Sequence, residues 1–322
     1  MGRQAAREVS GEAGVTRVLG ALRSRWVRTG FGVVALAGAG YALVRDRHSI
    51  LLALHGLPLG HVLLAVLANL VYLVCTMASW RAVLADLGSR LPVRAAFEMF
   101  FVSQLGKYVP GGVWHLVAVS ELGMDRDIPR RRSVSAIAVA TVVGIGTGFV
   151  AAVPLLVQAG RSLPGRGWLW LALPAALLLL APAVLNRLLG WAMRLLRREP
   201  LEQPMTHRGT ATAALWALLG WGVVGLEVWL LGLGLGLGRP SLLAVVGAYA
   251  IAWVAGYLVV VAPAGLGPRE LVLGVLLAGA LPAGSAVALV LLTRVLQTAA
   301  DVVMAGTGYL MRRRAPSAAS PT

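Results

Sequence analysis

Charged side chains are scarce in this chain of 322 residues. They make up 13% of it, about half of the roughly 25% found in soluble domains. Hydrophobic residues make up 58%, and the mean hydropathy is +0.79. The longest polar stretches are the N-terminal arm and a loop at 187–210, which leaves little length for a soluble catalytic domain. The composition therefore predicts an all-α polytopic membrane protein.

Cysteine is nearly absent, which limits the chemistry further. The single Cys75 excludes an internal disulfide and most thiolate metal sites. The glycine-rich run at 232–238 lacks the acidic residue and amphipathic helix of a dinucleotide site, so close helix packing explains it better. No nucleophile and base stand in a catalytic arrangement, so we expect no cofactor, no metal and no enzyme activity. The histidines also lack metal-ligand spacing: His48, His55, His61, His115 and His207.

Acidic residues are few as well, 13 against 29 basic ones, which gives a net charge of +16. In a soluble protein this charge would suggest a nucleic-acid partner. In a membrane protein it indicates the positive-inside rule and attraction to an anionic membrane surface, so we expect no nucleic-acid partner. Residues 1–28 hold six arginines and no signal-cleavage pattern, which predicts a basic cytoplasmic arm.

Seven apolar segments suit helices that cross a hydrocarbon core of about 30 Å. We therefore predict one transmembrane domain at 29–311, followed by a cytoplasmic tail at 312–322. The segments lie at 29–44, 59–79, 133–158, 168–186, 211–235, 242–262 and 283–311. Two further stretches, 95–121 and 268–281, are too interrupted or too short to be plain spans.

Arginine placement orients these segments. With the N-terminus inside, the cytoplasmic segments 1–28, 81–94, 126–132, 187–208 and 312–314 hold 21 arginines. Five lie outside: Arg45, Arg47, Arg161, Arg166 and Arg239. The pattern predicts that both termini are cytoplasmic.

This topology requires two segments to return to the side from which they enter. Residues 95–121 would enter from the cytoplasm, and residues 242–281 would enter from outside. The predicted fold is therefore about seven spanning helices with two opposed re-entrant helical hairpins, each broken at its tip by glycine and proline. Opposed hairpins of this kind are typical of transporters with inverted repeats.

The first break contains the only lysine and reads Gly106-Lys107-Tyr108-Val109-Pro110-Gly111-Gly112-Val113-Trp114-His115. Pro110 donates no backbone hydrogen bond, and Gly111 and Gly112 permit backbone angles that other residues avoid. A helix beginning near Val113 would present free amides to an anion, such as a lipid phosphate, beside the charge of Lys107. The alternative is an interfacial turn with a snorkelling lysine. Three neighbours offer hydrogen-bonding groups: Tyr108, Trp114 and His115.

The second break reads Pro263-Ala264-Gly265-Leu266-Gly267-Pro268-Arg269-Glu270. Glu270 near a helix N-terminus is favoured by the helix dipole, whereas Arg269 is not. Arg269 in that position indicates a facing phosphate or carboxylate. The alternative is a local Arg269–Glu270 pair that closes a tight turn.

The last span carries Arg294, Gln297 and Asp301 on one helical face. An arginine at bilayer depth costs roughly 2.5–3.5 kcal/mol, so we expect a partner for Arg294. Asp301, Glu270 and Glu227 are the candidates. Pairing between helices and contact with a substrate both remain open for this face.

Elsewhere, Asp125-Arg126-Asp127 imitates a metal-binding motif. Asp127 lies two residues before Pro129, however, so we expect an ordinary helix N-cap there.

Together the two breaks and the late arginine resemble the lysylphosphatidylglycerol synthase transmembrane region, a flippase-like family, over about residues 25–312. Pro268 and the absence of an arginine at 119–121 depart from the family pattern. The resemblance covers these residues: Lys107, Tyr108, Pro110, Gly111, Gly112, Pro263, Gly265, Gly267, Arg269, Glu270 and Arg294.

The resemblance implies movement of a polar-headed lipid, a phospholipid or a polyprenyl phosphate, between leaflets of a bacterial plasma membrane. No aminoacyl-transferring domain is present, so it implies no lipid synthesis. One alternative is a polyprenyl-phosphate-dependent glycosyltransferase, for which Asp46 is the only available outward acid. Another is a non-catalytic partner of a separate lipid-modifying enzyme. A homo-oligomer is also compatible with the sequence.

Overall fold

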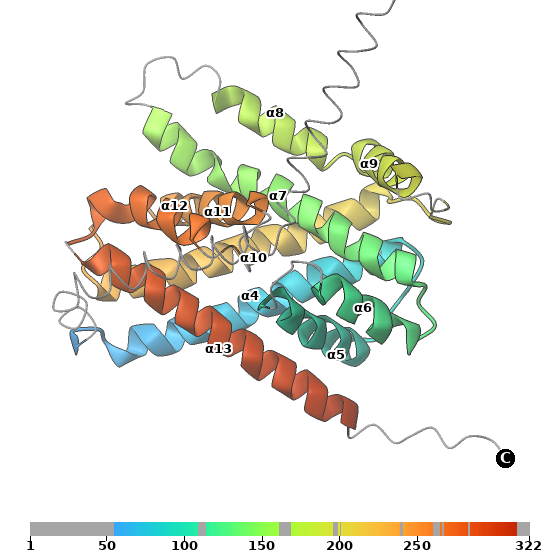
Figure 1. Ribbon diagram of the computed structural model, residues 1–322. Coiled ribbons are helices and arrows are strands. Elements are labelled where there is room, and N and C mark those ends of the chain that lie inside the picture. The colour runs from blue at the N-terminus through green and yellow to red at the C-terminus, as the bar shows by residue number, and fades with distance from the viewer. Residues whose placement is uncertain are drawn as a thin grey trace, which may run out of the picture.

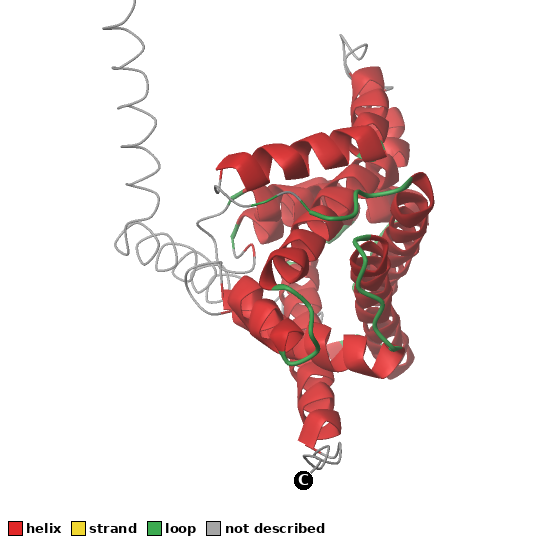
Figure 2. Cartoon of the chain, turned by 90° about the vertical axis from the view of Figure 1, so that its right-hand side faces the viewer, coloured by secondary structure: helices red, strands yellow, loops and turns green. Residues whose placement is uncertain are grey.

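The computed structural model describes residues 55–108, 114–160, 169–195, 199, 201–238, 241–259, 265, 267–282 and 284–313. Within these ranges every regular element is a helix (Figures 1 and 2). Several predictions fall outside them, including the N-terminal arm, the segment 29–44 and most of the C-terminal tail. So do the five arginines predicted on the outer side, and with them Asp46, His48, Pro110, Gly111, Gly112 and Pro263.

In the described ranges, four helices are long and apolar enough to cross a membrane, and they confirm four of the predicted segments. They are α4 (Leu59–Asp86), α7 (Arg130–Gly160), α10 (His207–Gly234) and α13 (Ser285–Arg313). Helix α4 packs along α10, while α7 packs against α10 and α11 (Figure 1). The chain is thus built as a multi-pass membrane protein.

The apolar segment predicted at 168–186 is a membrane-crossing candidate, but it is bent. Helices α8 (Leu169–Leu179) and α9 (Pro182–Leu195) meet there at a 60° bend. The physical reason is Pro182, which lacks a backbone N–H and cannot continue the helix that precedes it. Counted as one bent span, the pair brings the membrane-crossing candidates in the described ranges to five.

The region of the first break folds back on itself as hairpin one. It consists of α5 (Val93–Gln104), the 3₁₀ turn η1 (Leu105–Tyr108) and α6 (Trp114–Met124). Helices α5 and α6 pack side by side (Figure 1). The buried Glu98 binds Arg94 at 3.2 Å and Arg126 at 2.6 Å, so the two ends of the hairpin lie together.

The region of the second break forms hairpin two. It consists of α11 (Leu242–Leu258), α12 (Pro268–Leu277) and the 3₁₀ turn η4 (Ala278–Ala280). Helix α11 packs against α12, and the N–H of Gly238, before α11, donates to the Ala280 carbonyl at 2.8 Å. The two ends of hairpin two therefore also lie together.

Ionic contacts join the segments that the arginine count places on one side. Asp86 accepts from Thr206 N at 2.7 Å, and Arg132 binds Glu202 at 2.5 Å. Arg94 donates to the Met311 carbonyl at the end of α13 at 3.0 Å. Hairpin one begins at this ionic end of the bundle. Hairpin two begins at the opposite end, because α10 runs away from the ionic end, from His207 to Gly234, and hairpin two follows it in the chain.

The expected N-cap at Asp127 is wrong. Asp127 lies in a turn with φ of 57°, and α7 begins at Arg130, which places Pro129 at the capping position. The neighbouring Asp125 instead binds Arg312 at 2.7 Å and holds the end of α13 to hairpin one.

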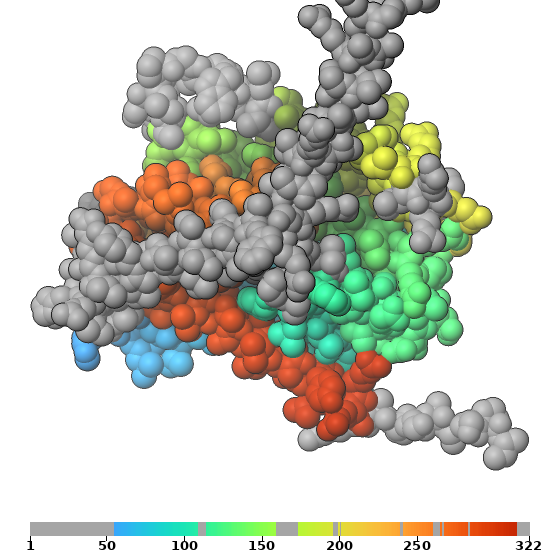
Figure 3. All heavy atoms as spheres, in the orientation of Figure 1, coloured from blue at the N-terminus to red at the C-terminus, as the bar shows by residue number. Residues whose placement is uncertain are grey.

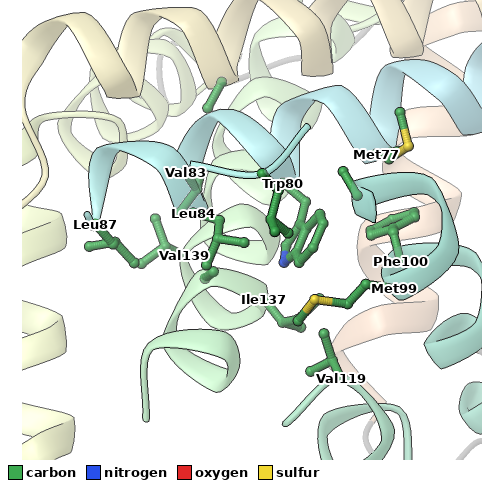
Figure 4. Close-up of a cluster of buried hydrophobic side chains, with 14 of the residues drawn as sticks. Met77, Trp80, Val83, Leu84, Leu87, Met99, Phe100, Val119, Ile137 and Val139 are labelled. Atoms are coloured by element: carbon green, nitrogen blue, oxygen red, sulfur yellow. The ribbon is translucent and has the colours of Figure 1, made fainter. Parts of the chain in front are cut away.

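Two apolar cores hold the bundle. The first surrounds hairpin one, where the Trp80 and Phe100 rings lie 5.3 Å apart and contact the cluster of Met99 and Ile137 (Figure 4). The second joins α10 to hairpin two and α13 around Tyr249. Since lipid is as apolar as these side chains, close packing and polar contacts hold the helices together.

Candidate functional site

A cavity of about 370 Å³ lies where the two apolar cores meet. Its wall includes Trp80 and Phe100 of the first core and Trp221 of the second. Hairpin one and helices α12 and α13 share one face of the molecule (Figure 3). The cavity brings together most of the described residues singled out in the sequence: Lys107, Tyr108, His115, Gly265, Arg269, Arg294, Gln297 and Asp301.

Lys107 does not stand free in this cavity. Its Nζ lies 2.7 Å from Asp301 Oδ2 of α13, and the Tyr108 hydroxyl donates to the same oxygen at 2.5 Å. The Asp301 side chain is 4% exposed and that of Lys107 is 30% exposed. These contacts join the tip of hairpin one to α13 and neutralise both charges.

Arg269 has a different environment, at the start of α12. Its guanidinium donates to Gln297 Oε1 and lies 5.0 Å from the centre of the Tyr249 ring. The Tyr249 hydroxyl lies 2.8 Å from Gln297 Nε2, which fixes the amide. Within the described ranges, no carboxylate forms an ion pair with Arg269.

Glu270 caps the helix that carries Arg269. Its Oε2 accepts from Gly267 N at 2.7 Å, and its Oε1 lies 3.5 Å from Arg294 Nη1. Arg294 thus pairs with Glu270, one of its three candidate partners. This arrangement favours a structural role for Glu270, and neither Glu270 nor Gly267 is part of the cavity wall.

Glu227 of α10 lies behind the cavity wall and is fully buried. Its Oε2 accepts from Gln297 Nε2 at 3.3 Å. Its Oε1 has no hydrogen-bond partner in the described part of the chain, and the same holds for the buried His115 Nδ1. Polar atoms buried in this way are costly, so they mark positions where a proton or a ligand would be stabilised.

Two glycines allow the tips of the hairpins to close. A Cβ on Gly256 of α11 would lie 2.8 Å from Arg269 Cβ, so only glycine lets Arg269 lie against α11. A Cβ on Gly106 would overlap the His115 backbone, which packs α6 onto the η1 turn. Each motif therefore needs its glycine for a close approach of backbone, besides any contact with a ligand.

Sequence reasoning missed the aromatic part of the wall. Tyr72, Trp221, Trp253 and Tyr257 line the cavity, and Trp253 stacks on Tyr257 with ring centres 5.2 Å apart. Tyr249, which holds Gln297, was also missed. A signal existed, because a tyrosine hydroxyl inside an apolar segment requires a polar partner.

The charge of the cavity wall is unbalanced toward positive. Among its described residues, three cations, Lys107, Arg269 and Arg294, line it with one carboxylate, Asp301. Since Lys107 is paired with Asp301 and Arg294 with Glu270, Arg269 is the lining cation that an incoming anion can neutralise. An aromatic wall around such an arginine suits a ligand with an anionic group and an apolar part.

These features define a multi-pass membrane protein with a cavity, lined by charged and aromatic side chains, between two helical hairpins. The model of the lysylphosphatidylglycerol synthase TM region matches residues 27–305, and the chain belongs to that family. The family associates the chain with lipid handling. No curated protein matches the chain.

Proposed function

We propose that this protein moves a phosphate-bearing, polar-headed lipid between the leaflets of the plasma membrane. One observation carries the proposal: the two hairpins enter the bundle from opposite ends and bring Lys107 and Arg269 to one cavity. Broken helices that meet at one polar site are the architecture by which transporters hold a substrate.

Arg269 is the principal phosphate ligand in this proposal. Its planar guanidinium offers paired N–H donors that match two phosphate oxygens, and Tyr249 holds its plane in place. His115 adds a hydrogen-bonding group on the facing hairpin. The backbone amides of Gly111 and Gly112 stay a prediction from the sequence, because these residues lie outside the described ranges.

Lys107 has a more specific role than simple phosphate binding. Its pair with Asp301 holds hairpin one against α13, so the approach of an anion to Lys107 competes with Asp301. Such competition would loosen the tip of hairpin one when the headgroup arrives. The lipid phosphate would thereby break the Lys107–Asp301 contact that holds the cavity closed at the tip of hairpin one.

We place the ionic end of the bundle in the cytoplasm, where the positive-inside rule puts arginine-rich segments. Hairpin one then re-enters the membrane from the cytoplasm and hairpin two from outside, and both termini are cytoplasmic. The exposed leucines and valines of α4 and α13 suit contact with lipid tails.

The alternative of a membrane glycosyltransferase rests on Asp46 as its outward acid, and Asp46 lies outside the described ranges. Asp301 is the carboxylate among the described lining residues, and Lys107 and Tyr108 occupy its Oδ2 atom. A buried, ion-paired aspartate is a poor general base. Asp301 is therefore a poor substitute for Asp46 in that role.

A deletion strain tests this function. We expect its phospholipids or polyprenyl phosphates to change their distribution between leaflets, measured by lipidomics with leaflet-specific chemical labelling. The wild-type gene and a variant of the exposed Arg90, Arg90→Ala, should restore the distribution, whereas Arg269→Ala should not. An unchanged distribution in the deletion strain, or full restoration by Arg269→Ala, would contradict the proposal.

A further inference from the structure

We propose that Glu227 is a proton-binding site that takes up a proton when an anionic headgroup binds Arg269. This inference rests on the proposed function, because it concerns the same cavity. It adds what that function leaves open, namely how a negative charge is accommodated inside the membrane and what ion can drive its movement.

Gln297 links the two residues directly. Its Oε1 accepts from the Arg269 guanidinium, while its Nε2 donates to Glu227 Oε2 at 3.3 Å. Arg269 and Gln297 line the cavity, and Glu227 lies one side chain behind them. An event at the Arg269 guanidinium is therefore transmitted to Glu227 through a single amide.

The carboxylate of Glu227 has little other support. It is 0% exposed, and its Oε1 has no hydrogen-bond partner within the described ranges. A buried carboxylate with one neutral donor is stable in its charged form only if a cation balances it. Arg269, across Gln297, is that cation.

Other charged and titratable groups around Glu227 come from each neighbouring helix. Helix α11 supplies the Tyr249 hydroxyl, and α4 supplies Tyr72, which interacts electrostatically with Glu227. On α13, Arg294 and Asp301 flank Gln297, but Glu270 and Lys107 respectively pair with them. Helix α7 contributes no titratable side chain between 133 and 160. Arg269 thus remains the balancing charge.

A bound phosphate would change this balance. When a phosphate pairs directly with Arg269, the positive charge is satisfied and Glu227 is left as an uncompensated buried anion. Uptake of one proton by Glu227 restores neutrality, and release of the lipid returns the proton. Because the two effects are linked, a phosphate that increases the affinity of Glu227 for a proton is itself bound more tightly when Glu227 is protonated. The headgroup and one proton would then occupy the protein together.

The test measures protons taken up on binding to the purified full-length protein in detergent. The probe is dihexanoyl phosphatidylglycerol, whose phosphodiester does not titrate near neutral pH, so any proton uptake belongs to the protein. Calorimetry in buffers of different ionisation enthalpy counts those protons. Measured over about pH 6–10, uptake by wild type should rise toward one proton per bound lipid at the pH where Glu227 of the free protein is ionised, and affinity should fall there by up to about tenfold per pH unit.

Glu227→Gln keeps the shape and the contact with Gln297 but holds no titrating proton. We expect this variant to bind the probe with no proton uptake and no pH dependence. The exposed Glu121→Gln serves as the matched control, because Glu121 pairs with Arg130 at the surface, and it should behave as wild type.

Each outcome decides a different claim. Binding by wild type without proton uptake, or unchanged uptake in Glu227→Gln, overturns the role of Glu227 and leaves the proposed function standing. Absence of probe binding by folded wild-type protein overturns the phosphate site itself. Should Glu227→Gln not fold, infrared difference spectra of wild type decide: lipid addition should produce the band of a protonated carboxyl, and its absence contradicts the proposal.

Discussion

At the scale of single residues, the cavity assigns different tasks to cations that look alike in the sequence. Lys107 and Arg269 both sit beside a Gly/Pro break, and both suggest a phosphate. The structure pairs Lys107 with a buried aspartate and leaves Arg269 with neutral partners. The difference arises from Asp301, about 190 positions from Lys107, and Gln297, about 30 positions from Arg269. The sequence next to each cation does not reveal such distant partners.

The pairing of Lys107 leads to a stability prediction. Lys107→Ala leaves Asp301 buried with the Tyr108 hydroxyl as its remaining partner among the described residues, so the variant should unfold more easily than wild type. Breaking a fully buried pair costs about 3–5 kcal/mol, and the partial exposure of Lys107 should keep the loss below that. Thermal unfolding in detergent measures it.

The double variant Lys107→Ala/Asp301→Asn removes both charges and provides the control. It should recover much of the lost stability, because no uncompensated charge remains. A double variant that is no more stable than Lys107→Ala would show that the ion pair does not hold hairpin one to α13.

At the scale of elements, substitutions of Glu270 can separate its two roles, as the cap of α12 and as the ion-pair partner of Arg294. Glu270→Gln keeps an oxygen for Gly267 N but loses the ion pair with Arg294, whereas Glu270→Ala loses both. We expect both variants to be less stable than wild type. Alanine should cost about 1 kcal/mol more than glutamine for the lost hydrogen bond. Equal stability of the two variants would exclude the capping role.

The contact between α11 and α12 depends on a glycine. Gly256→Ala would place a Cβ 2.8 Å from Arg269 Cβ. Overpacking of this kind costs roughly 1–3 kcal/mol and should displace Arg269, so lipid binding should weaken as well.

Gly222→Ala on α10 is the matched control for Gly256→Ala, since nothing lies within 4 Å of its added Cβ. It should be neutral, or stabilise α10 by about 0.5–1 kcal/mol, because alanine favours a helix. Measured by thermal unfolding and lipid binding, equal effects of the two substitutions would contradict the close approach at Gly256.

The long apolar elements could be predicted from the sequence, because hydropathy fixes where a helix must be. Segments 59–79, 133–158, 211–235 and 283–311 correspond to α4, α7, α10 and α13. The bend at Pro182 could not be predicted, because a proline in an apolar segment does not by itself show whether the helix breaks. Pro174 lies inside α8 without such a break. Tyr249 was missed because its partner is 48 residues away.

At the scale of the whole molecule, the two ends of the bundle differ in charge. The contacts of Asp86, Arg94, Arg132 and Asp125 gather the arginine-rich segments at one end. Because the two ends differ, the proposed orientation of both hairpins can be tested by asking which end faces the cell exterior, without measuring transport.

Accessibility of introduced cysteines tests that orientation, with the buried Cys75 as background. In intact cells, a membrane-impermeant maleimide should label Gly279→Cys, at the end of hairpin two. Arg90→Cys, at the ionic end, should react only after the membrane is permeabilised. The reverse pattern would invert the topology, and labelling of both in intact cells would contradict it.

The central claim is that an anionic lipid crosses the membrane through the cavity and is held there by Arg269. The most direct measurement is the transbilayer movement of a headgroup-labelled anionic phospholipid in proteoliposomes, followed by quenching from outside. Wild type and Arg90→Ala should move the lipid at least tenfold faster than Arg269→Ala, consistent with the loss of one charge-assisted contact of about 1.5–3 kcal/mol. Movement by wild type no faster than in protein-free vesicles, or equally fast in Arg269→Ala, would contradict the account.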